Sequence, residues 1–215
     1  MTPFAPGVRV PAPPPSLECN IFTFPAGTII HRVHDERFGA ADFNPGLGHS
    51  RFAPFAIGGT KVPTAYGATS LECAVFETIF HEIAAAASFK SVRWSAIEPL
   101  MYSTLELVRE LRLAPLFFAD LMKLGLERNQ LIDTPKSTYV ATHAWSPAIH
   151  AAPQSPEGIV WVSRRFDEEK ALMLFGSRVS AIDLEPIASV KIIAHAPSLK
   201  VVADLAERAG IVIVR

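Results

Sequence analysis

The chain has few of the residues that stabilise small secreted or metal-binding proteins. It contains two cysteines, Cys19 and Cys73, which are too few for a disulfide framework and lack the spacing of metal ligands. No run approaches the roughly 20 apolar residues that cross a bilayer, and the N-terminal segment does not resemble a signal peptide. We therefore expect a soluble, cytoplasmic protein without a bound metal.

An excess of charge of either sign is also missing. The 20 Lys and Arg residues nearly balance the 21 Asp and Glu residues, so the formal net charge is -1. Neither nucleic acid nor an anionic membrane is attracted to such a chain as a whole. Basic runs with interleaved aromatic residues are absent too, which argues against direct nucleic-acid binding. Any anion site must be local and built from a few arginines.

The common nucleotide and metal motifs are absent. The segment 46–51 has glycines at positions 46 and 48 but no third glycine, so it is not a Rossmann fingerprint, and no GxxxxGK[ST] loop occurs. His31 and His34 are three residues apart in an expected strand, where their side chains point to opposite faces. Joint metal ligation by these histidines is therefore not expected.

The overall composition is that of a folded protein. Hydrophobic residues make up 49% of the 215 residues and charged residues 19%, which suits one sizeable core. Residues 1–24 are rich in proline and predict an extended arm that packs loosely on the body. Residues 25–215 show no linker, so we interpret them as one domain.

Strands and helices mix in this domain without regular βαβ alternation. We therefore predict a single α+β domain with a mixed β-sheet core and surrounding helices. Expected strands lie at residues 27–33, 64–69, 92–97, 158–163, 189–194 and 211–214. Expected helices lie at residues 70–87, 105–111, 116–127, 139–150, 167–175 and 197–210. Thr69 and Glu72 suggest a capping box for the first helix, and residues 38–63 form a long turn-rich loop region.

One carboxylate of the first helix is a candidate functional residue. This helix has too few polar positions to keep every acidic side chain in water, and Glu77 lies among Cys73, Phe76 and Phe80. A partly buried carboxylate is costly unless it is paired or used. The pattern therefore predicts that Glu77 either belongs to a buried ion pair or is a catalytic group.

Four other residues are weak signals when taken singly. Arg32 alone is more often a structural ion-pair partner than a ligand anchor, and Tyr66 is more often a core residue. Arg51 follows the glycines of the turn-rich loop. Ser163 ends an apolar strand without the tight glycine turn of a nucleophile elbow, so its simplest role is to close that strand.

Taken together and in order, these residues resemble the RES domain family, which is named for arginine, glutamate and serine. The order and spacing agree over roughly residues 28–176. The resembling segments are His31–Val33, Phe43–Pro45, Ser50–Phe52, Thr64–Glu77, Gly158–Arg164 and Phe175.

The resemblance implies a fold similar to that of ADP-ribosyltransferase toxins and an activity that consumes NAD without a metal. RES proteins are usually toxins of bacterial Xre/RES-type toxin–antitoxin pairs. The implied partner is a cognate antitoxin, often carrying a helix-turn-helix domain, which covers the active-site entrance. A homodimer within such a complex is compatible with the resemblance.

The resemblance also assigns roles. Catalytic candidates are Glu77, Arg32 and Ser163, and NAD-binding candidates are Arg32, Arg51, Tyr66 and Ser163. Glu77 would stabilise an oxocarbenium-like transition state, with nicotinamide as a cationic leaving group that needs no strong general acid. Arg32 and Arg51 would bind the pyrophosphate through planar forks. Tyr66 would stack on nicotinamide, and Ser163 would hydrogen-bond the amide or the ribose.

The residues leave the acceptor open. Water would make the protein an NAD glycohydrolase, inorganic phosphate a phosphorylase, and a protein side chain an ADP-ribosyltransferase. NAD degradation with water or phosphate is the simplest of these. A different alternative is a non-enzymatic module that binds a nucleotide or a protein partner, in which Arg32, Glu77 and Ser163 form a structural ion-pair cluster.

Overall fold

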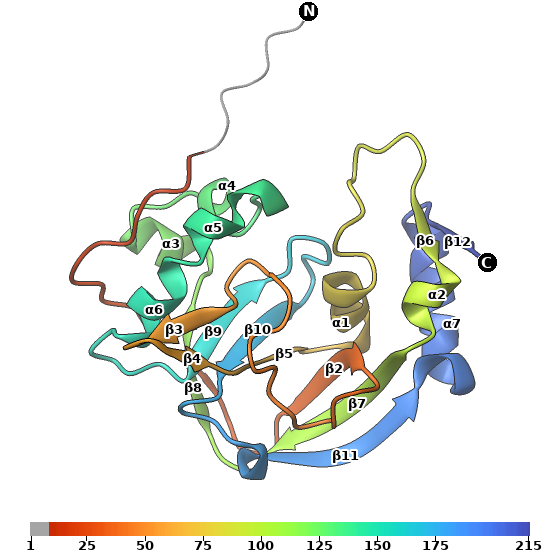
Figure 1. The fold of residues 1–215 in the computed structure, drawn as a ribbon, viewed down its shortest axis with the longest axis horizontal. Coiled ribbons are helices and arrows are strands. Elements are labelled where there is room, and N and C mark those ends of the chain that lie inside the picture. Colours follow the sequence, from red (N-terminus) through yellow and green to blue (C-terminus); the bar gives the residue numbers. More distant parts are fainter. Residues whose placement is uncertain (1–8) are drawn as a thin grey trace, which may run out of the picture.

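A curled eight-stranded sheet organises the fold in the computed structural model, which describes residues 9–215 (Figure 1). The strands across this sheet are, in order, β1 (Phe22–Phe24), β8 (Leu111–Pro115), β9 (Gly158–Val162), β10 (Lys170–Phe175), β5 (Thr64–Ala68), β2 (Ile29–Asp35), β7 (Leu100–Leu107) and β11 (Leu184–Lys191). Strands β8 and β9 run parallel, and the other neighbours run antiparallel. The predicted α+β class with a mixed sheet is confirmed.

Two smaller sheets and several helices flank the large sheet. The small sheets are the antiparallel hairpin β3 (Phe55–Ile57) with β4 (Thr60–Val62) and the parallel pair β6 (Ser91–Arg93) with β12 (Val212–Val214). The α-helices of residues 9–215 are α1 (Leu71–Thr78), α2 (Trp94–Ile97), α3 (Phe118–Lys123), α4 (Arg128–Leu131), α5 (Tyr139–Thr142), α6 (Trp145–His150) and α7 (Ala196–Arg208). None of these helices has the length and hydropathy of a membrane-spanning segment.

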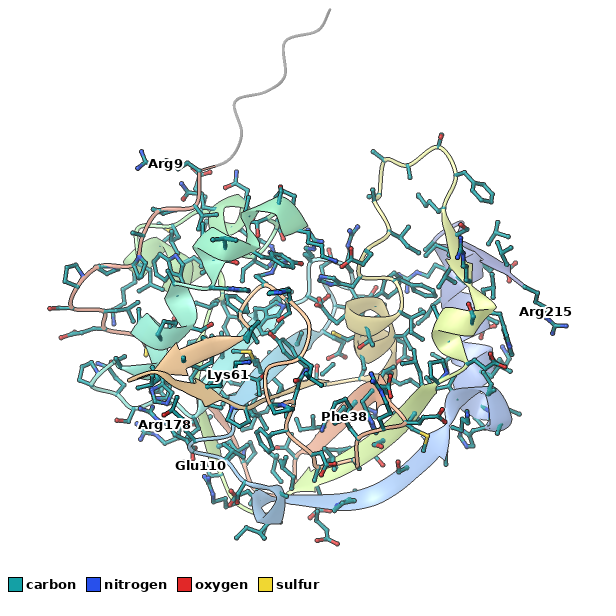
Figure 2. All side chains as sticks on the ribbon, viewed as in Figure 1. Arg9, Phe38, Lys61, Glu110, Arg178 and Arg215 are labelled. Atoms are coloured by element: carbon teal, nitrogen blue, oxygen red, sulfur yellow. The ribbon has the colours of Figure 1, made fainter. Side chains whose placement is uncertain are left out.

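Helix α1 lies centrally in this arrangement. Figure 1 shows α3 to α6 gathered on one side of α1, and α2, α7, β6 and β12 on the other. Side chains fill the spaces between the sheet and these helices (Figure 2). The short 3-10 turns are Lys136–Thr138, Ala181–Asp183 and Ile192–Ala194.

Strand β10 is buried on both faces of the sheet. Ala171, Met173 and Phe175 belong to the apolar cluster that includes α1. Leu172 and Leu174 belong to a second cluster on the opposite face. Successive side chains of a strand point to opposite faces, and both faces of β10 are buried. The sequence of β10 is therefore a continuous run of apolar residues instead of an alternation.

That run explains a wrong prediction. The helix expected at 167–175 is mostly strand β10, and periodicity cannot separate a buried strand from a buried helix. The helix expected at 105–111 is also wrong, because this segment is the end of β7 and the start of β8. Leu105, Leu107 and Leu111 all pack in the second cluster, where alternate strand positions bring them.

Other boundaries differ from the predictions in smaller ways. The expected strand 92–97 is strand β6 followed by α2, and the helix expected at 139–150 is divided into α5 and α6. Of the helix expected at 116–127, α3 is the helical part. The strand expected at 189–194 is the end of β11 followed by a 3-10 turn. The expected loop 38–63 contains the β3–β4 hairpin.

The first helix begins at the predicted place but ends early. Helix α1 stops at Thr78 instead of continuing to residue 87. Its N-cap is Ser70, whose hydroxyl accepts a hydrogen bond from the Cys73 N–H (3.2 Å). The Thr69 hydroxyl instead donates to Glu169. The predicted strands at 27–33, 64–69 and 158–163, the last helix and the final strand are confirmed.

The proline-rich segment contacts the body over its described part. Leu17 and Cys19 are buried, and the Pro11 carbonyl accepts a hydrogen bond from the Trp145 indole (2.9 Å). Strand β1 then pairs with β8 at one edge of the large sheet. Residues 1–8 of the expected arm lie outside the described residues, and the division at residue 24 stays a prediction.

The large sheet is nearly divided between β2 and β5. These strands pair at a single position, where His31 lies opposite Ala68. By contrast, β2 pairs with β7 along the whole of Ile29–Asp35, and β5 pairs with β10 along its full length. The missing pairing opens the sheet between the first residues of β5 and the last residues of β2, away from the end of β5 that leads into α1.

The crowding at the start of β9 gives a test of this sheet order. A Cβ atom on Gly158 would lie 2.2 Å from the Met173 carbonyl oxygen of β10. We expect Gly158→Ala to lower the free energy of unfolding by about 3 kcal/mol, measured by urea denaturation, because the backbone must shift. Gly39→Ala is the control, because its added methyl meets only the Asp42 side chain. Equal stability of both variants would contradict the sheet order.

Candidate active site

A cavity of about 320 Å³ lies where β2, β5 and the C-terminal part of α1 meet. Four of the five residues singled out in the sequence line it: Arg32, Arg51, Tyr66 and Glu77. The fifth, Ser163, is fully buried at the end of β9 and contacts the cavity indirectly, through Glu77. The structure therefore brings residues from four distant segments to one place.

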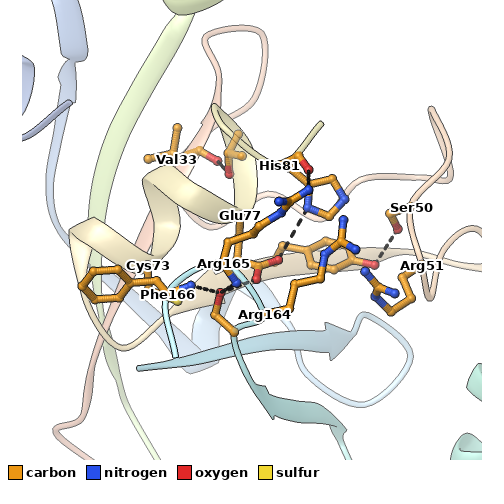
Figure 3. A network of polar contacts seen from close by, with 12 residues as sticks. Val33, Ser50, Arg51, Cys73, Glu77, His81, Arg164, Arg165 and Phe166 are labelled. Atoms are coloured by element: carbon orange, nitrogen blue, oxygen red, sulfur yellow. Dashed lines mark hydrogen bonds and ion pairs between the residues drawn. The ribbon is translucent and has the colours of Figure 1, made fainter. Parts of the chain in front are cut away.

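Ser163 anchors one oxygen of Glu77, the carboxylate that Figure 3 shows within a network of polar contacts. Its hydroxyl donates to Glu77 Oε1 (2.6 Å) and accepts hydrogen bonds from the backbone N–H groups of Arg165 and Phe166 (3.1 Å each). A hydroxyl has two acceptor lone pairs and one proton, so the two N–H donors direct that proton towards Glu77. This anchoring role was not predicted from the sequence, and direct contact between Ser163 and NAD stays a prediction.

Glu77 is partly buried, as its helix pattern indicated, with 17% of its side chain exposed. Oε1 is held by Ser163, whereas Oε2 accepts no hydrogen bond within residues 9–215. Oε2 is therefore the oxygen that is available to accept a proton from a hydroxyl group or to stabilise a developing positive charge.

Arg32 and Arg51 are buried cations without a carboxylate partner. Each is 6% exposed, and neither forms an ion pair within the described chain. Burial lowers the pKa of Arg32 to about 10, with Asp42 opposing in part, and burial also lowers the pKa of Arg51. Both remain charged at neutral pH. An unpaired buried charge is costly, so the site favours an anionic ligand.

Backbone and hydroxyl oxygens hold one side of each guanidinium. Arg32 Nη1 donates to the Ala40 carbonyl (2.8 Å). Arg51 Nη1 donates to the Thr134 hydroxyl and to the Leu131 carbonyl (3.1 Å). Among residues 9–215, Nε and Nη2 of both arginines make no hydrogen bond. The free side of such a planar fork fits two oxygens of a phosphate or carboxylate.

Tyr66 contributes an aromatic surface on β5. Its hydroxyl forms a hydrogen bond with the Ser50 hydroxyl (2.6 Å), and its ring meets Trp161 edge to face. Burial raises the pKa of Tyr66, so the phenol stays neutral. The ring is therefore fixed at both ends, which suits a stacking surface, although stacking on nicotinamide stays a prediction.

The sequence analysis missed His81 as a site residue. Its Nδ1 lies 3.8 Å from Glu77 Oε2, and its Nε2 lies 2.8 Å from the Tyr139 hydroxyl. Burial, followed by the positive charges of Arg164 and Arg51, lowers its pKa to about 4. The spacing of Glu77 and His81, four residues apart around a helix end, was the signal available in the sequence.

Arg164 and Arg165 were also missed as site residues. They follow Ser163, and their guanidinium groups donate to the Thr134 carbonyl (3.1 Å) and the His81 carbonyl (3.3 Å). Both add positive potential around Glu77. The adjacent arginines after the β9 strand were the signal.

The histidines of β2 have separate partners. His31 Nδ1 bonds the Tyr102 hydroxyl (2.8 Å), and His34 Nε2 bonds the Ser103 hydroxyl (2.8 Å). Within residues 9–215, no three His, Cys, Asp or Glu side chains are grouped so that they could hold a metal ion.

Comparison with known proteins identifies the family. The model of the RES domain matches residues 29–197, most of the chain. The chain belongs to the RES domain family. All five predicted site residues lie inside the matched region.

The fold of this RES domain is similar to that of a solved structure. One match is a chain in the crystal structure of the M. tuberculosis MbcT–MbcA toxin–antitoxin complex, with a TM-score of 0.58 and 15% sequence identity. It covers 84% of this chain and 92% of that chain. At this identity the similarity concerns the fold. No curated protein matches the chain.

The largely buried imidazole of His81 makes the stability of the RES domain depend on pH. An unfolded histidine binds a proton near pH 6.5, whereas folded His81 binds one only near pH 4. The unfolded state therefore gains protons first as the pH falls, and stability is lost between pH 6.5 and about 4.

We expect the wild type to lose about 2 kcal/mol more of its unfolding free energy than His81→Asn between pH 7 and pH 5. Urea denaturation at both pH values measures this difference. The other titrating groups are shared by both proteins, so they cancel in the comparison. Parallel pH profiles would contradict the neutral state of His81 in the folded protein.

Proposed function

We propose that this RES domain degrades NAD by cleaving the bond between nicotinamide and ribose. The observation that carries the proposal is Glu77, which has one oxygen anchored by Ser163 and the other without a hydrogen bond in the described chain, in a cavity that two buried arginines without a carboxylate partner also line. This combination offers a carboxylate for a cationic transition state and positive charge for a pyrophosphate.

The pyrophosphate of NAD is the anion for which Arg32 and Arg51 are suited. Each arginine uses Nη1 for the protein and keeps Nε and Nη2 for a ligand. The cavity, at about 320 Å³, lies at the lower end of the roughly 300–1,000 Å³ found for small-molecule sites. A dinucleotide would therefore place its reacting half in the cavity and extend beyond it.

The reaction needs few groups. The bond between the ribose C1″ and the nicotinamide nitrogen breaks, and its electron pair leaves with nicotinamide, which becomes neutral. The positive charge moves to the ribose, where Glu77 Oε2 stabilises it. Water or inorganic phosphate then adds to C1″, and a proton is released when water is the acceptor. Tyr66 would hold the nicotinamide ring by stacking.

We further propose that the protein is the toxin of a toxin–antitoxin pair. The supporting observations are membership of the RES domain family and the similar fold within the MbcT–MbcA toxin–antitoxin complex. The partner would be a cognate antitoxin, with a helix-turn-helix domain, that covers the cavity entrance. The toxin would act on NAD in the cytoplasm.

The carboxylate can be tested directly. We expect Glu77→Gln to remain folded and to reduce nicotinamide release from NAD roughly 100- to 1000-fold, because the neutral amide no longer stabilises the ribose cation. Chromatography follows the release, with and without phosphate, and the product names the acceptor: ADP-ribose for water and its 1″-phosphate for phosphate.

Glu72→Gln is the matched control, because Glu72 lies on the same helix outside the cavity lining. It should leave the rate unchanged. Nicotinamide release that survives in Glu77→Gln would refute the assigned site.

Toxicity gives a second test. Expression of the wild type without its partner should stop bacterial growth and deplete cellular NAD, because the proposed enzyme is unrestrained. Glu77→Gln, produced to the same level, should permit normal growth. Normal growth and NAD content with the wild type would argue against a toxin.

A further inference from the structure

His81 contacts Glu77 from the side opposite Ser163. It lies after the end of α1 and lines the cavity. Its Nδ1 is 3.8 Å from Glu77 Oε2, and this nitrogen is buried without a hydrogen-bond partner in the described chain. Its Nε2 is 2.8 Å from the hydroxyl of Tyr139 on α5. An unpartnered buried nitrogen beside the reacting carboxylate calls for an explanation.

The imidazole is neutral at pH 7 because its surroundings oppose a second proton. Arg51, Arg164 and Arg165 are the cations near it, and they act in the same direction as burial. Glu82, next in the chain, opposes them only in part. A neutral imidazole carries its single proton on either Nδ1 or Nε2.

Both neighbours of the ring favour a proton on Nδ1. A lone pair on Nδ1 would face the lone pairs of Glu77 Oε2 and be repelled, whereas an N–H there is attracted. Tyr139 is buried, and the one hydrogen bond of its hydroxyl within residues 9–215 is to His81 Nε2. Its proton can therefore be donated to an unprotonated Nε2.

We propose that His81 is a positioning residue for Glu77: as the Nδ1–H tautomer selected by Tyr139, it orients the second carboxylate oxygen towards the reacting ribose. This rests on the role that the proposed function gives to Glu77. Rotation about the last bond of a glutamate is only weakly restricted, so a single anchor at Oε1 leaves the carboxylate plane free. A second donor at Oε2 fixes that plane. Such contacts are often long before substrate binds and shorten in the complex.

Two amide variants separate the two ring nitrogens. The amide nitrogen of His81→Asn stands near the position of Nδ1, so a donor towards Glu77 is kept. The longer side chain of His81→Gln reaches instead the position of Nε2, beside Tyr139. We expect His81→Asn to retain kcat for NAD loss within about 5-fold and His81→Gln to lose about 100-fold, with little change of KM. Equal loss of kcat in both variants would overturn the inference.

Nitrogen NMR of the full-length wild type tests the tautomer without NAD. Ring ¹⁵N shifts at pH 7 distinguish protonated from unprotonated nitrogens, and the His81 signals are those absent from His81→Asn. We expect a protonated Nδ1, an unprotonated Nε2 and a pKa of about 4. If the protein consumes NAD but Nε2 of His81 is protonated, the inference about His81 is overturned and the proposed function stands. A wild type that leaves NAD intact would overturn the proposed function, and this role of His81 with it.

Discussion

The constraint on which the site depends is the incomplete pairing of β2 and β5. The strands approach closely only near His31 and Ala68, where Gly67 is required because a Cβ atom there would lie 2.5 Å from Ile30 Cγ2. Beyond that point the strands no longer share hydrogen bonds, and the cavity occupies the opening. Arg32 projects from one strand, Tyr66 from the other, and α1 carries Glu77 into the gap. A fully paired sheet would leave no room for a ligand.

The site stores positive charge that the protein does not neutralise. Arg32 and Arg51 are buried, and carbonyl and hydroxyl oxygens, rather than carboxylates, hold them. Neutral acceptors fix the direction of a guanidinium without cancelling its charge, so its attraction for an anion is preserved. The arrangement is less stable than one with buried ion pairs, because each cation loses solvation without a directly paired carboxylate. Such a cost to stability is common in binding sites, as the proposed function requires here.

Local sequence patterns predicted the features of the fold and the site that depend on residues close together in the sequence. The α+β class, the strands around Arg32, Tyr66 and Ser163, and the partly buried Glu77 all followed from short segments. The segments 105–111 and 167–175 were mistaken for helices because burial on both sheet faces, a tertiary property, replaces the alternation typical of strands. The anchoring of Glu77 by Ser163 and the pairing of His81 with Tyr139 join residues 86 and 58 positions apart. Contacts between residues so far apart in the sequence cannot be predicted from a local pattern.

The order of strands in the sheet also sets when a nascent chain first has a site. Strand β10 lies between β5 and β9, although it follows β5 by about a hundred residues during synthesis. Until β9 and β10 have left the ribosome, strand β5, which carries Tyr66, lacks its pairing partner β10. Glu77 likewise lacks its hydrogen-bond donor Ser163. In an incomplete chain, Glu77, Arg32 and Arg51 therefore lie on segments that the sheet does not yet hold together. Translation itself delays assembly of the site until Phe175, the last residue of β10, has emerged.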